Sequence, residues 1–260
     1  MNNVEQQTYI KNAVNGFTFE HLKKMATDDS LTTHEKIGFV NEQREGYADA
    51  IFTDIISKLP AINQRNKKIA DIGCGCDELA HLIMKRCVDN ENSLCLIDSQ
   101  EMLNLLPPPE KFVRKMAGKF PRDFENFIEN EKNSFDSIIV YSVIHAVSLE
   151  DSVFNFIDRA VELLVPGGSL LLGDLPNRTK RKRFFLSPEG IKTHREYTGD
   201  PNAMPNVDLF EIEYGKLDDA IIFAIMQRYR AAGMETYLLP QADNLPLANR
   251  REDILIVKRG

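Results

Sequence analysis

A short apolar strand that runs directly into two closely spaced glycines, and then into a helix, constrains the fold of this chain more than any other feature. The predicted strand covers Lys68–Ile72, the glycines are Gly73 and Gly75, and helical character begins at Glu78. Glycine lets the backbone turn sharply and approach a ligand closely, and the N-terminus of a helix offers free N–H donors. This order predicts a ligand-binding loop at the end of a buried strand.

The rest of the chain continues this alternation of strand and helix. Apolar patterning predicts six further strands, at Ser93–Ile97, Phe112–Met116, Ser137–Tyr141, Ser169–Gly173, Thr236–Leu239 and Asp253–Val257. Ser148 is predicted to begin the helix that carries the apolar residues from Val153 to Leu164. Strands that alternate with helices predict a mostly parallel sheet. The last two strands are too close for a helical crossover, which predicts an antiparallel pair.

Two segments stand outside this alternation. Residues 1–60 are predicted to form a helical cap, with a helix over about Glu42–Leu59, and residues 1–40 are expected to close over a bound ligand with Tyr47 near the edge. Residues 61–260 form the predicted main domain. Within it, residues 177–216 show no clear period. About 40 structureless residues inside a compact domain are typical of a functional insertion, which we expect to bind the substrate.

Composition excludes several classes of protein. The 260 residues are 43% apolar and carry a net charge of −7, which disfavours duplex nucleic acid as a partner. The sequence has no apolar run long enough to span a bilayer and no secretory signal at its start. The four cysteines lack the spacing of a zinc site, so no metal is expected, and they are interpreted as reduced thiols of a cytoplasmic protein.

Two acidic residues indicate which ligand the loop takes. Asp71 precedes the glycines, and Asp98 ends the next strand, 27 residues later, where a carboxylate can accept hydrogen bonds from both hydroxyls of a ribose. A dinucleotide fingerprint needs a third glycine, but Glu78 takes its place, and its charge would repel a pyrophosphate at the helix start. Asp71 suits a cationic amino group instead of a phosphate.

These features resemble the class I S-adenosylmethionine-dependent methyltransferases. Their first motif, an acidic residue followed by an apolar residue and Gly-x-Gly, matches Asp71 to Gly75, and their second matches Asp98. The stretches Phe135–Ser142 and Val165–Leu170 resemble the family's fourth strand and the turn before its fifth. The resemblance covers about residues 65–176 and 217–257. It implies a Rossmann-like seven-stranded sheet, mostly parallel with an antiparallel C-terminal strand, and S-adenosyl-L-methionine as cofactor, with S-adenosyl-L-homocysteine as product.

The resemblance also implies a set of cofactor-binding residues. We expect these to be Tyr47, Asp71, Gly73, Cys74, Gly75, Asp98, Ser99, Met102, Gly118, Lys119, Phe120, Tyr141 and Ser142. Many family members carry Gly-Asp after the third strand, whereas this chain has Gly118-Lys119-Phe120-Pro121. Recognition of the adenine therefore falls to backbone groups near Gly118 and Phe120.

Catalytic candidates follow the fourth and fifth strands, where residues face the cofactor. His145 suits a general base because imidazole titrates near neutral pH, and a buried histidine bonded to a backbone carbonyl is the equal alternative. Asp174 could orient the acceptor or act as base, or it could cap a loop.

A basic run directly after the fifth strand predicts the acceptor. In an acidic protein it could clamp an anionic small molecule, or it could be a solvated helix face. The expected substrate-binding residues are Asn177, Arg178, Arg181, Arg183 and His194, and a solvated loop position is the alternative for His194.

Together these patterns predict O-methylation of a small molecule. The stretches Gly173–Asn177, Leu239–Gln241 and Arg250–Asp253 are similar to methyltransferases of bacterial surface-polysaccharide clusters, which implies a sugar, a nucleotide-linked sugar or a phosphate-type group as acceptor. The alternatives are a non-catalytic methyltransferase-like binding subunit and an NAD-dependent oxidoreductase. The sequence assigns no oligomeric state.

Overall fold

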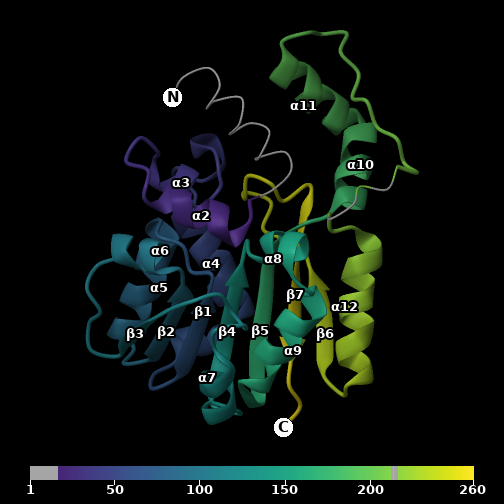
Figure 1. The fold of residues 1–260 in the computed structure, drawn as a ribbon. Helices are drawn as coiled ribbons and strands as arrows, with labels where there is room; N and C mark the ends of the chain where they lie inside the picture. Colours follow the sequence, from purple (N-terminus) through teal and green to yellow (C-terminus); the bar gives the residue numbers. More distant parts are fainter. Residues whose placement is uncertain (1–16, 212, 214–215) are drawn as a thin grey trace.

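A single seven-stranded sheet forms the centre of the computed structural model, which describes residues 17–211, 213 and 216–260 (Figure 1). The strand order is β3-β2-β1-β4-β5-β7-β6. The strands are β1 (Lys68–Ile72), β2 (Ser93–Asp98), β3 (Val113–Ala117), β4 (Phe135–Tyr141), β5 (Leu164–Pro176), β6 (Glu235–Leu239) and β7 (Arg251–Val257). The first five pair in parallel. β7 is antiparallel to both β5 and β6 and lies between them, as the Rossmann-like prediction requires.

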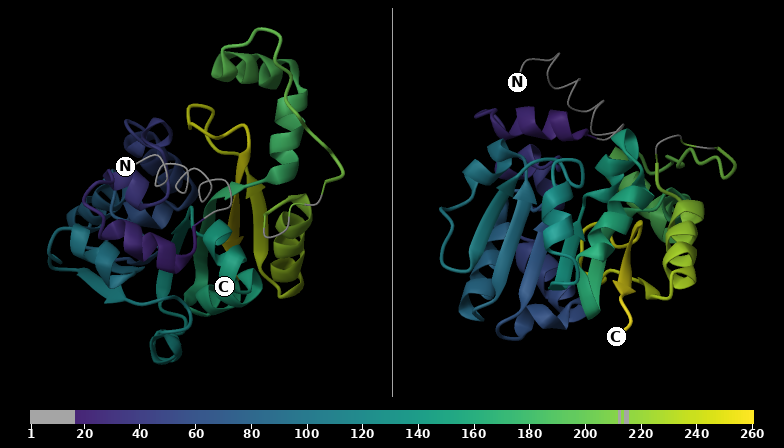
Figure 2. Two further views of the ribbon diagram at one scale, coloured as in Figure 1. Left: turned by 45° about the horizontal axis from the view of Figure 1, so that its top comes forward. Right: turned by 60° about the horizontal axis from the view of Figure 1, so that its bottom comes forward.

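Helices cover both faces of the sheet (Figure 2). One face packs against α4 (Ala48–Lys58), α5 (Glu78–Asp89) and α6 (Gln100–Leu105). The other packs against α7 (Glu125–Asn130), α9 (Val153–Glu162) and α12 (Asp219–Ala231). Alternate strand residues point to opposite layers, so Ile69 and Ala70 are both fully buried but belong to different apolar clusters. This two-sided burial explains the continuous apolar strands of the sequence.

Short N-terminal elements lie over the carboxyl ends of the parallel strands (Figure 1). They are α2 (Phe19–Ala26), α3 (Thr33–Lys36) and the 3₁₀ turn η1 (Asn41–Gln43). Thr18 and Thr32 each form a capping box, which fixes where α2 and α3 begin. The predicted helix over Glu42–Leu59 begins later than expected, at Ala48. Residues 1–16 of the predicted cap lie outside the described residues.

The segment from 177 to 216 contains two helices, which corrects the expectation of a structureless insertion. They are α10 (Arg178–Leu186) and α11 (Pro188–Thr198), and they project as an arm from the end of β5 (Figures 1 and 2). Asn177 and Ser187 cap them through their side chains. Both helices are polar with little buried apolar surface, so they show no strong amphipathic period.

The region between β4 and β5 also differs from the prediction. Ser148 lies inside a short helix, α8 (Ile144–Glu150), and Ser152 instead accepts the capping hydrogen bond from the Asn155 N–H at the start of α9. The Ser148 hydroxyl donates to the His145 carbonyl within α8. The helix that carries the apolar residues from Val153 therefore begins after Ser152, four residues later than predicted.

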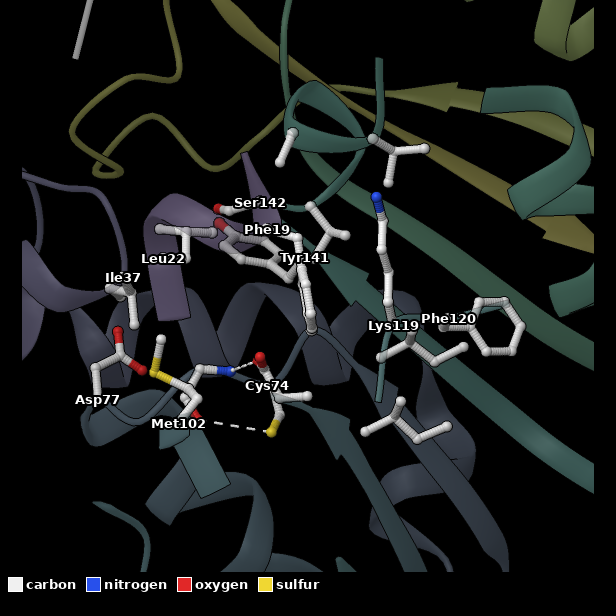
Figure 3. Close-up of a pocket in the computed structure, with 18 of the residues that line it drawn as sticks. Phe19, Leu22, Ile37, Cys74, Asp77, Met102, Lys119, Phe120, Tyr141 and Ser142 are labelled. Atoms are coloured by element: carbon white, nitrogen blue, oxygen red, sulfur yellow. Dashed lines mark hydrogen bonds between the residues drawn. The ribbon is translucent and has the colours of Figure 1, made fainter. Parts of the chain in front are cut away.

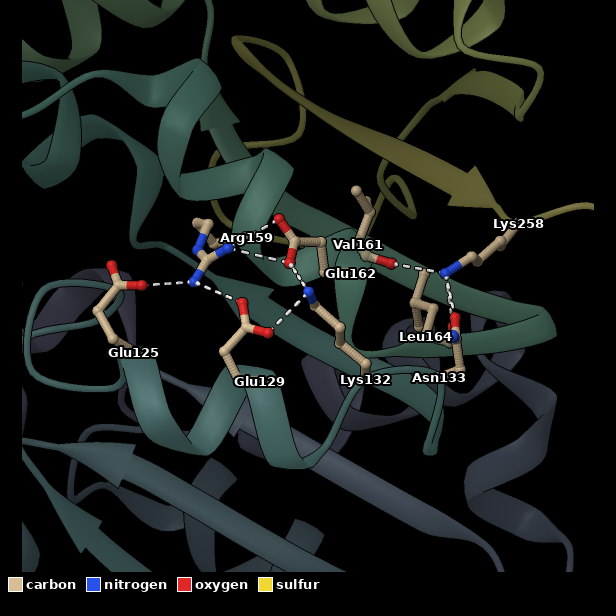
Figure 4. A network of polar contacts seen from close by, with 9 residues as sticks. All are labelled: Glu125, Glu129, Lys132, Asn133, Arg159, Val161, Glu162, Leu164 and Lys258. Carbon is tan, nitrogen blue, oxygen red and sulfur yellow. Dashed lines mark hydrogen bonds and ion pairs between the residues drawn. The ribbon is translucent and has the colours of Figure 1, made fainter.

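A polar network ties the helices together at the opposite end of the sheet (Figure 4). Arg159 of α9 pairs with Glu125 and Glu162, at 2.6 and 2.9 Å. Lys258, just after β7, donates to the carbonyls of Val161 and Leu164. Charged contacts here join α7, α9 and the last strand, far from the loop that follows β1. In the part of the chain that the structure describes, no helix has the length and apolarity needed to cross a membrane.

Candidate functional site

A cavity opens where β1, β2 and β4 end, under the N-terminal elements (Figure 3). Its volume is about 130 Å³. Motif residues from four segments line it: Gly73, Cys74, Gly75, Asp98, Met102, Gly118, Lys119, Phe120, Tyr141 and Ser142. The fold thus brings together the stretches that the sequence analysis assigned to the cofactor.

The glycine loop must remain glycine for steric reasons. Gly73 and Gly75 have φ of +77° and +66°, which disfavours other residues. A Cβ atom added to Gly73 would lie 2.4 Å from Cγ2 of Val143. The loop therefore presents bare backbone to the cavity between β1 and α5.

Three carboxylates surround this loop. Asp98 accepts hydrogen bonds from the N–H groups of Gly75 and Ser99, at 3.0 and 2.7 Å, yet burial raises its pKa to about 6. Burial, followed by repulsion from Asp98 and Asp77, raises the pKa of Asp71 to about 8. Burial also raises the pKa of Asp77, which lines the cavity. A cationic ligand would reduce the repulsion between these carboxylates, whereas a pyrophosphate would increase it.

The adenine end predicted from the third strand is apolar and aromatic. The Phe120 ring packs edge-on against Phe156, with centroids 5.1 Å apart, and both side chains line the cavity. Lys119 takes the place of the family's usual aspartate, and its ammonium pairs with Glu150 and Asp151 at 3.4 and 2.8 Å. The N–H groups of Gly118 and Lys119 donate to the Asp98 carbonyl and the Asp123 carboxylate, at 2.9 and 2.7 Å.

The N-terminal elements form the roof of the cavity. Phe19, Leu22, Ile37 and Phe39 contribute apolar side chains, as Figure 3 shows for the first three. The Phe19 N–H donates to the Glu150 carboxylate at 2.8 Å, which joins α2 to α8 on the opposite wall. The predicted edge residue Tyr47 does not line the cavity; it packs against the core beside α4.

Arg44 is a cavity residue that the sequence analysis missed. Its guanidinium lies 3.9 Å from the centroid of the Phe39 ring and donates to the Ser142 hydroxyl and to Asp174, at 2.6 and 3.1 Å. No local pattern marks this arginine, because it follows η1 in an irregular segment whose place over the strand ends is set by tertiary packing.

Asp174 is the centre of a buried polar hub. Besides Arg44, its carboxylate accepts hydrogen bonds from Ser142, Gln241 and Arg251. The Asp174 N–H donates to Asp253 at 2.8 Å. The neighbouring arginines and these hydrogen bonds lower the pKa of Asp174 despite its burial. A carboxylate this well stabilised in its ionised form is suited to positioning the two arginines rather than to accepting a proton.

Ser142 and Asp174 hold unusual backbone conformations. Their φ angles are +60° and +57°, in the left-handed region that residues other than glycine rarely adopt. Ser142 directly follows β4, Asp174 lies within β5 where its pairing with β7 is irregular, and the two face each other through their hydrogen bond. Such conformations cluster at functional sites, where the surrounding structure maintains them.

His145 lies on the first turn of α8, close to this hub. Its Nδ1 atom is buried and has no hydrogen-bond partner among the described residues. Burial, and then the charge of Arg251, lowers the pKa of His145 to about 4. The imidazole is therefore neutral at neutral pH and has a free ring nitrogen, so the alternative of a histidine satisfied at Nδ1 by a backbone carbonyl is not what the structure shows.

The predicted substrate-binding residues do not form one group. Asn177 is buried, caps α10 and donates to Asp219 and Glu252, both at 2.6 Å. Arg183 pairs with Asp219 at 2.6 Å. These two residues therefore have partners within the scaffold.

The other three predicted residues lie on the arm. Arg178 pairs with Glu213 at 3.3 Å. Arg181 and His194 both lie near the ring of Phe185. The guanidinium carbon of Arg181 lies 4.9 Å from the centroid of that ring, and the His194 ring centroid lies 6.3 Å from it.

Ser99 and Asp71 support the loop without lining the cavity. The Ser99 hydroxyl accepts from the Met102 N–H at 3.1 Å and so begins α6.

The four cysteines are buried free thiols. Among residues 17–211, 213 and 216–260, no three His, Cys, Asp or Glu side chains are grouped to hold a metal ion.

Solved structures with a similar fold include methyltransferases. The plantazolicin methyltransferase BpumL, solved with a triazolic desmethylPZN analog and SAH, aligns over 100% of both chains at 12% identity and a TM-score of 0.55. The CurJ carbon methyltransferase aligns over 100% of this chain and 72% of its own, with 15% sequence identity and a TM-score of 0.52. The putative methyltransferase solved in complex with the Haloferax volcanii Trm112 activator aligns over 92% of this chain and 98% of its own. The sequence identity is 12% and the TM-score is 0.52.

These likenesses show the fold of the S-adenosylmethionine-dependent methyltransferases. No protein-family model matches the sequence, and no curated protein gives a significant match. The activity of this chain therefore has to be argued from its own residues.

Proposed function

We propose that the protein transfers a methyl group from S-adenosyl-L-methionine to an oxygen atom of a small anionic acceptor. The observation that carries this proposal is the charge division of the site. Asp71, Asp77 and Asp98 surround the glycine loop, whereas the adjoining region around Arg251 is cationic. The acidic side suits the sulfonium and ammonium groups of the cofactor, and the basic side suits an anion.

The cavity residues fit this cofactor. Asp98 retains acceptor capacity beyond its two backbone hydrogen bonds, so it can bind ribose hydroxyls. The apolar wall of Met102 and Phe120 suits an adenine, and Arg44 is a cavity cation that can meet the amino-acid carboxylate. When bound, the cofactor supplies a methyl carbon made electrophilic by its sulfonium.

His145 is the residue that we assign to the chemistry of the acceptor. Its neutral imidazole has an unpaired Nδ1 atom that can take the proton of an acceptor hydroxyl as the oxygen forms its bond to the methyl carbon. The bound cofactor would supply the leaving group of this transfer, because its sulfur would keep the electron pair of the carbon–sulfur bond. Asp174 holds Arg44 and Arg251 at the boundary between the two halves of the site.

The cofactor assignment is tested by calorimetric titration of the whole chain with S-adenosyl-L-homocysteine and with NAD. We expect binding of the first and none of the second. Asp98→Ala removes charge-assisted hydrogen bonds of about 1.5–3 kcal/mol each, so affinity should fall at least tenfold. Asp89→Ala, which removes an exposed carboxylate on α5, is the matched control. Equal affinity in Asp98→Ala and wild type would contradict the ribose assignment, and selective NAD binding would favour the oxidoreductase.

The acceptor that we propose is a sugar, a nucleotide-linked sugar or a phosphate-type group of surface-polysaccharide biosynthesis in the cytoplasm. The support is the sequence resemblance around Gly173–Asn177 and Arg250–Asp253, together with the cationic side of the site. A screen of nucleotide-sugars and glycan precursors for methyl uptake tests it. Cofactor binding with no methyl uptake from any of them would favour the non-catalytic binding subunit.

A further inference from the structure

Most cations of the basic run on α10 are already used by the scaffold. Lys180 donates to the Arg251 carbonyl and Lys182 to the Glu211 carbonyl, both at 2.7 Å. Arg183 pairs with Asp219. Arg178 has a carboxylate partner in Glu213. Arg181 is therefore the arginine of the run that has no acidic ion-pair partner among the described residues.

A second arginine of the same kind reaches the same aromatic ring from a distant segment. The guanidinium carbon of Arg250, in the connection before β7, lies 5.6 Å from the centroid of Phe185, and that of Arg181 lies 4.9 Å from it. The Arg250 guanidinium donates to the side chain of its neighbour Asn249, at 3.2 Å, and has no acidic partner in the described part of the chain. Both arginine side chains are half-buried.

Holding these two cations together is unfavourable for the ligand-free protein. Burial, and then the charges of Arg181 and Arg251, lowers the pKa of Arg250. Burial, and then the charge of Arg178, lowers the pKa of Arg181. Like charges that are partly removed from water repel each other strongly, and a bound anion offsets this repulsion.

We propose that Arg181 and Arg250, held on the ring of Phe185, bind a phosphoryl group carried by the methyl acceptor. Two uncompensated guanidinium groups match the two negative charges of a phosphomonoester, whereas a carboxylate would leave one of them unpaired. Their planar donor sets suit the oxygens of a phosphoryl group. This inference rests on the proposed function, because it names the part of the acceptor that the basic side recognises.

The position of the pair relative to the cavity supports this role. Arg250 precedes Arg251, whose guanidinium lies 3.4 Å from Asp174. Asp174 in turn accepts a hydrogen bond from Ser142, which lines the cavity. Arg251 is also the charge that most affects His145. The phosphoryl group would therefore lie at the outer end of the acceptor, and the His145 side would face the atom that receives the methyl group.

The test uses the full chain and two probes, inorganic phosphate and glycerol 1-phosphate, titrated at constant ionic strength with S-adenosyl-L-homocysteine present. Arg181→Gln and Arg250→Gln should each weaken glycerol 1-phosphate binding at least tenfold, and the double variant should abolish it. Arg183→Gln is the matched control, because that arginine lies on the same helix but pairs with Asp219. Without ligand, Arg250→Gln should melt no lower than wild type, because the substitution relieves repulsion, which guards against misfolding as an explanation.

The outcomes separate this inference from the proposed function. Unchanged glycerol 1-phosphate binding in both glutamine variants, or equal loss in Arg183→Gln, would overturn the site. Binding of inorganic phosphate with rejection of glycerol 1-phosphate would overturn its assignment to an acceptor. A chain that binds S-adenosyl-L-homocysteine but neither phosphate would lose this site and keep the proposed function. A chain that binds glycerol 1-phosphate through the two arginines, but not S-adenosyl-L-homocysteine, would lose the proposed function and keep the anion site.

Discussion

Asp71 shows how a single residue of the site works against the stability of the fold. Its pKa of about 8 means that the folded protein keeps the proton of this carboxyl group through the acidic and neutral range, whereas an unfolded chain loses it near pH 4. Between these two values the folded state binds more protons than the unfolded state. The free energy of unfolding contributed by Asp71 therefore falls as the pH rises through this window.

Replacing Asp71 with asparagine should remove this penalty. Asparagine has nearly the shape of the protonated carboxyl group, so we expect Asp71→Asn to raise the melting temperature of the ligand-free protein at pH 8 and to raise it less at pH 5. Thermal unfolding at the two pH values measures the difference. A variant that melts below wild type at pH 8 would show that the carboxylate is not strained as the structure indicates. The same variant should bind S-adenosyl-L-homocysteine more weakly at pH 8, where part of the wild-type carboxyl group is ionised and can favour the ammonium group.

His145 permits a prediction about rate and titration at the same scale. Because its pKa is lowered to about 4, its imidazole should show no titration in NMR spectra between pH 5.5 and 8 in the ligand-free protein. With a methyl acceptor identified, His145→Ala should lower kcat by about 10²–10⁴-fold and leave S-adenosyl-L-homocysteine affinity nearly intact. Loss of stability with kcat preserved in the folded fraction would instead identify a structural histidine.

At the scale of elements, α2 serves in our proposal as a lid over the cofactor. Phe19 and Leu22 are partly exposed and line the cavity, so their contacts to a bound ligand replace contacts to water. The double substitution Phe19→Ala and Leu22→Ala should weaken S-adenosyl-L-homocysteine binding roughly tenfold or more, at about 25 cal/mol per Å² of apolar surface lost. Lys24→Ala, on the exposed side of the same helix, is the control. Equal affinities in all three proteins would argue against the lid.

The elements of the sheet could be predicted from the sequence because both faces of its strands are buried. Short, largely buried strands that are followed by glycine, such as Lys68–Ile72, are typical of such a sheet. The arm could not be predicted. α10 and α11 bury few residues, so their helices carry no strong apolar stripe, and their caps at Asn177 and Ser187 are local signals without a periodic pattern to support them.

The same contrast holds for the site. The loop and Asp98 follow from motifs, because a ligand that needs bare backbone and a carboxylate imposes both at fixed places in the chain. Arg44, Gln241 and Arg251 have no such signal. Arg44 lies far in sequence from Gln241 and Arg251, which both belong to the stretch that joins β6 to β7. Their meeting at Asp174 depends on the strand order around β5 and β7.

Across the whole molecule, a buried ion-pair chain connects the site with the opposite layer. Lys58 of α4 pairs with Asp54 at 2.5 Å and with Asp253 of β7 at 2.7 Å. Asp253 is fully buried and also accepts the N–H of Asp174. Helix, sheet and site are therefore held by one set of charges, whose members depend on one another.

Breaking this chain should destabilise the whole fold. Lys58→Met leaves two buried carboxylates without their cation, which costs about 3–5 kcal/mol at pH 8. The cost should shrink at pH 5, because burial already raises the pKa of Asp253 to about 6 and protonation removes its charge. Urea unfolding at both pH values measures it. Lys85→Met is the control: its pair with Asp89 is exposed, and its loss should cost about 0.5 kcal/mol or less. Similar costs for the two variants would refute the role of Lys58.

The position of β7 between β5 and β6 has a consequence for how the protein is made. β6 emerges from the ribosome before the strand that separates it from β5, and at 5–20 residues per second the 18 residues from Leu239 to Val257 take roughly one to four seconds. During that interval the apolar edge of β5 is open to other chains, which makes this the stage at which a nascent molecule is most prone to aggregate. The residues that line the cavity under α2 have by then all been synthesised, so a cofactor present in the cell could bind the growing chain before Arg250 and Arg251 take their places.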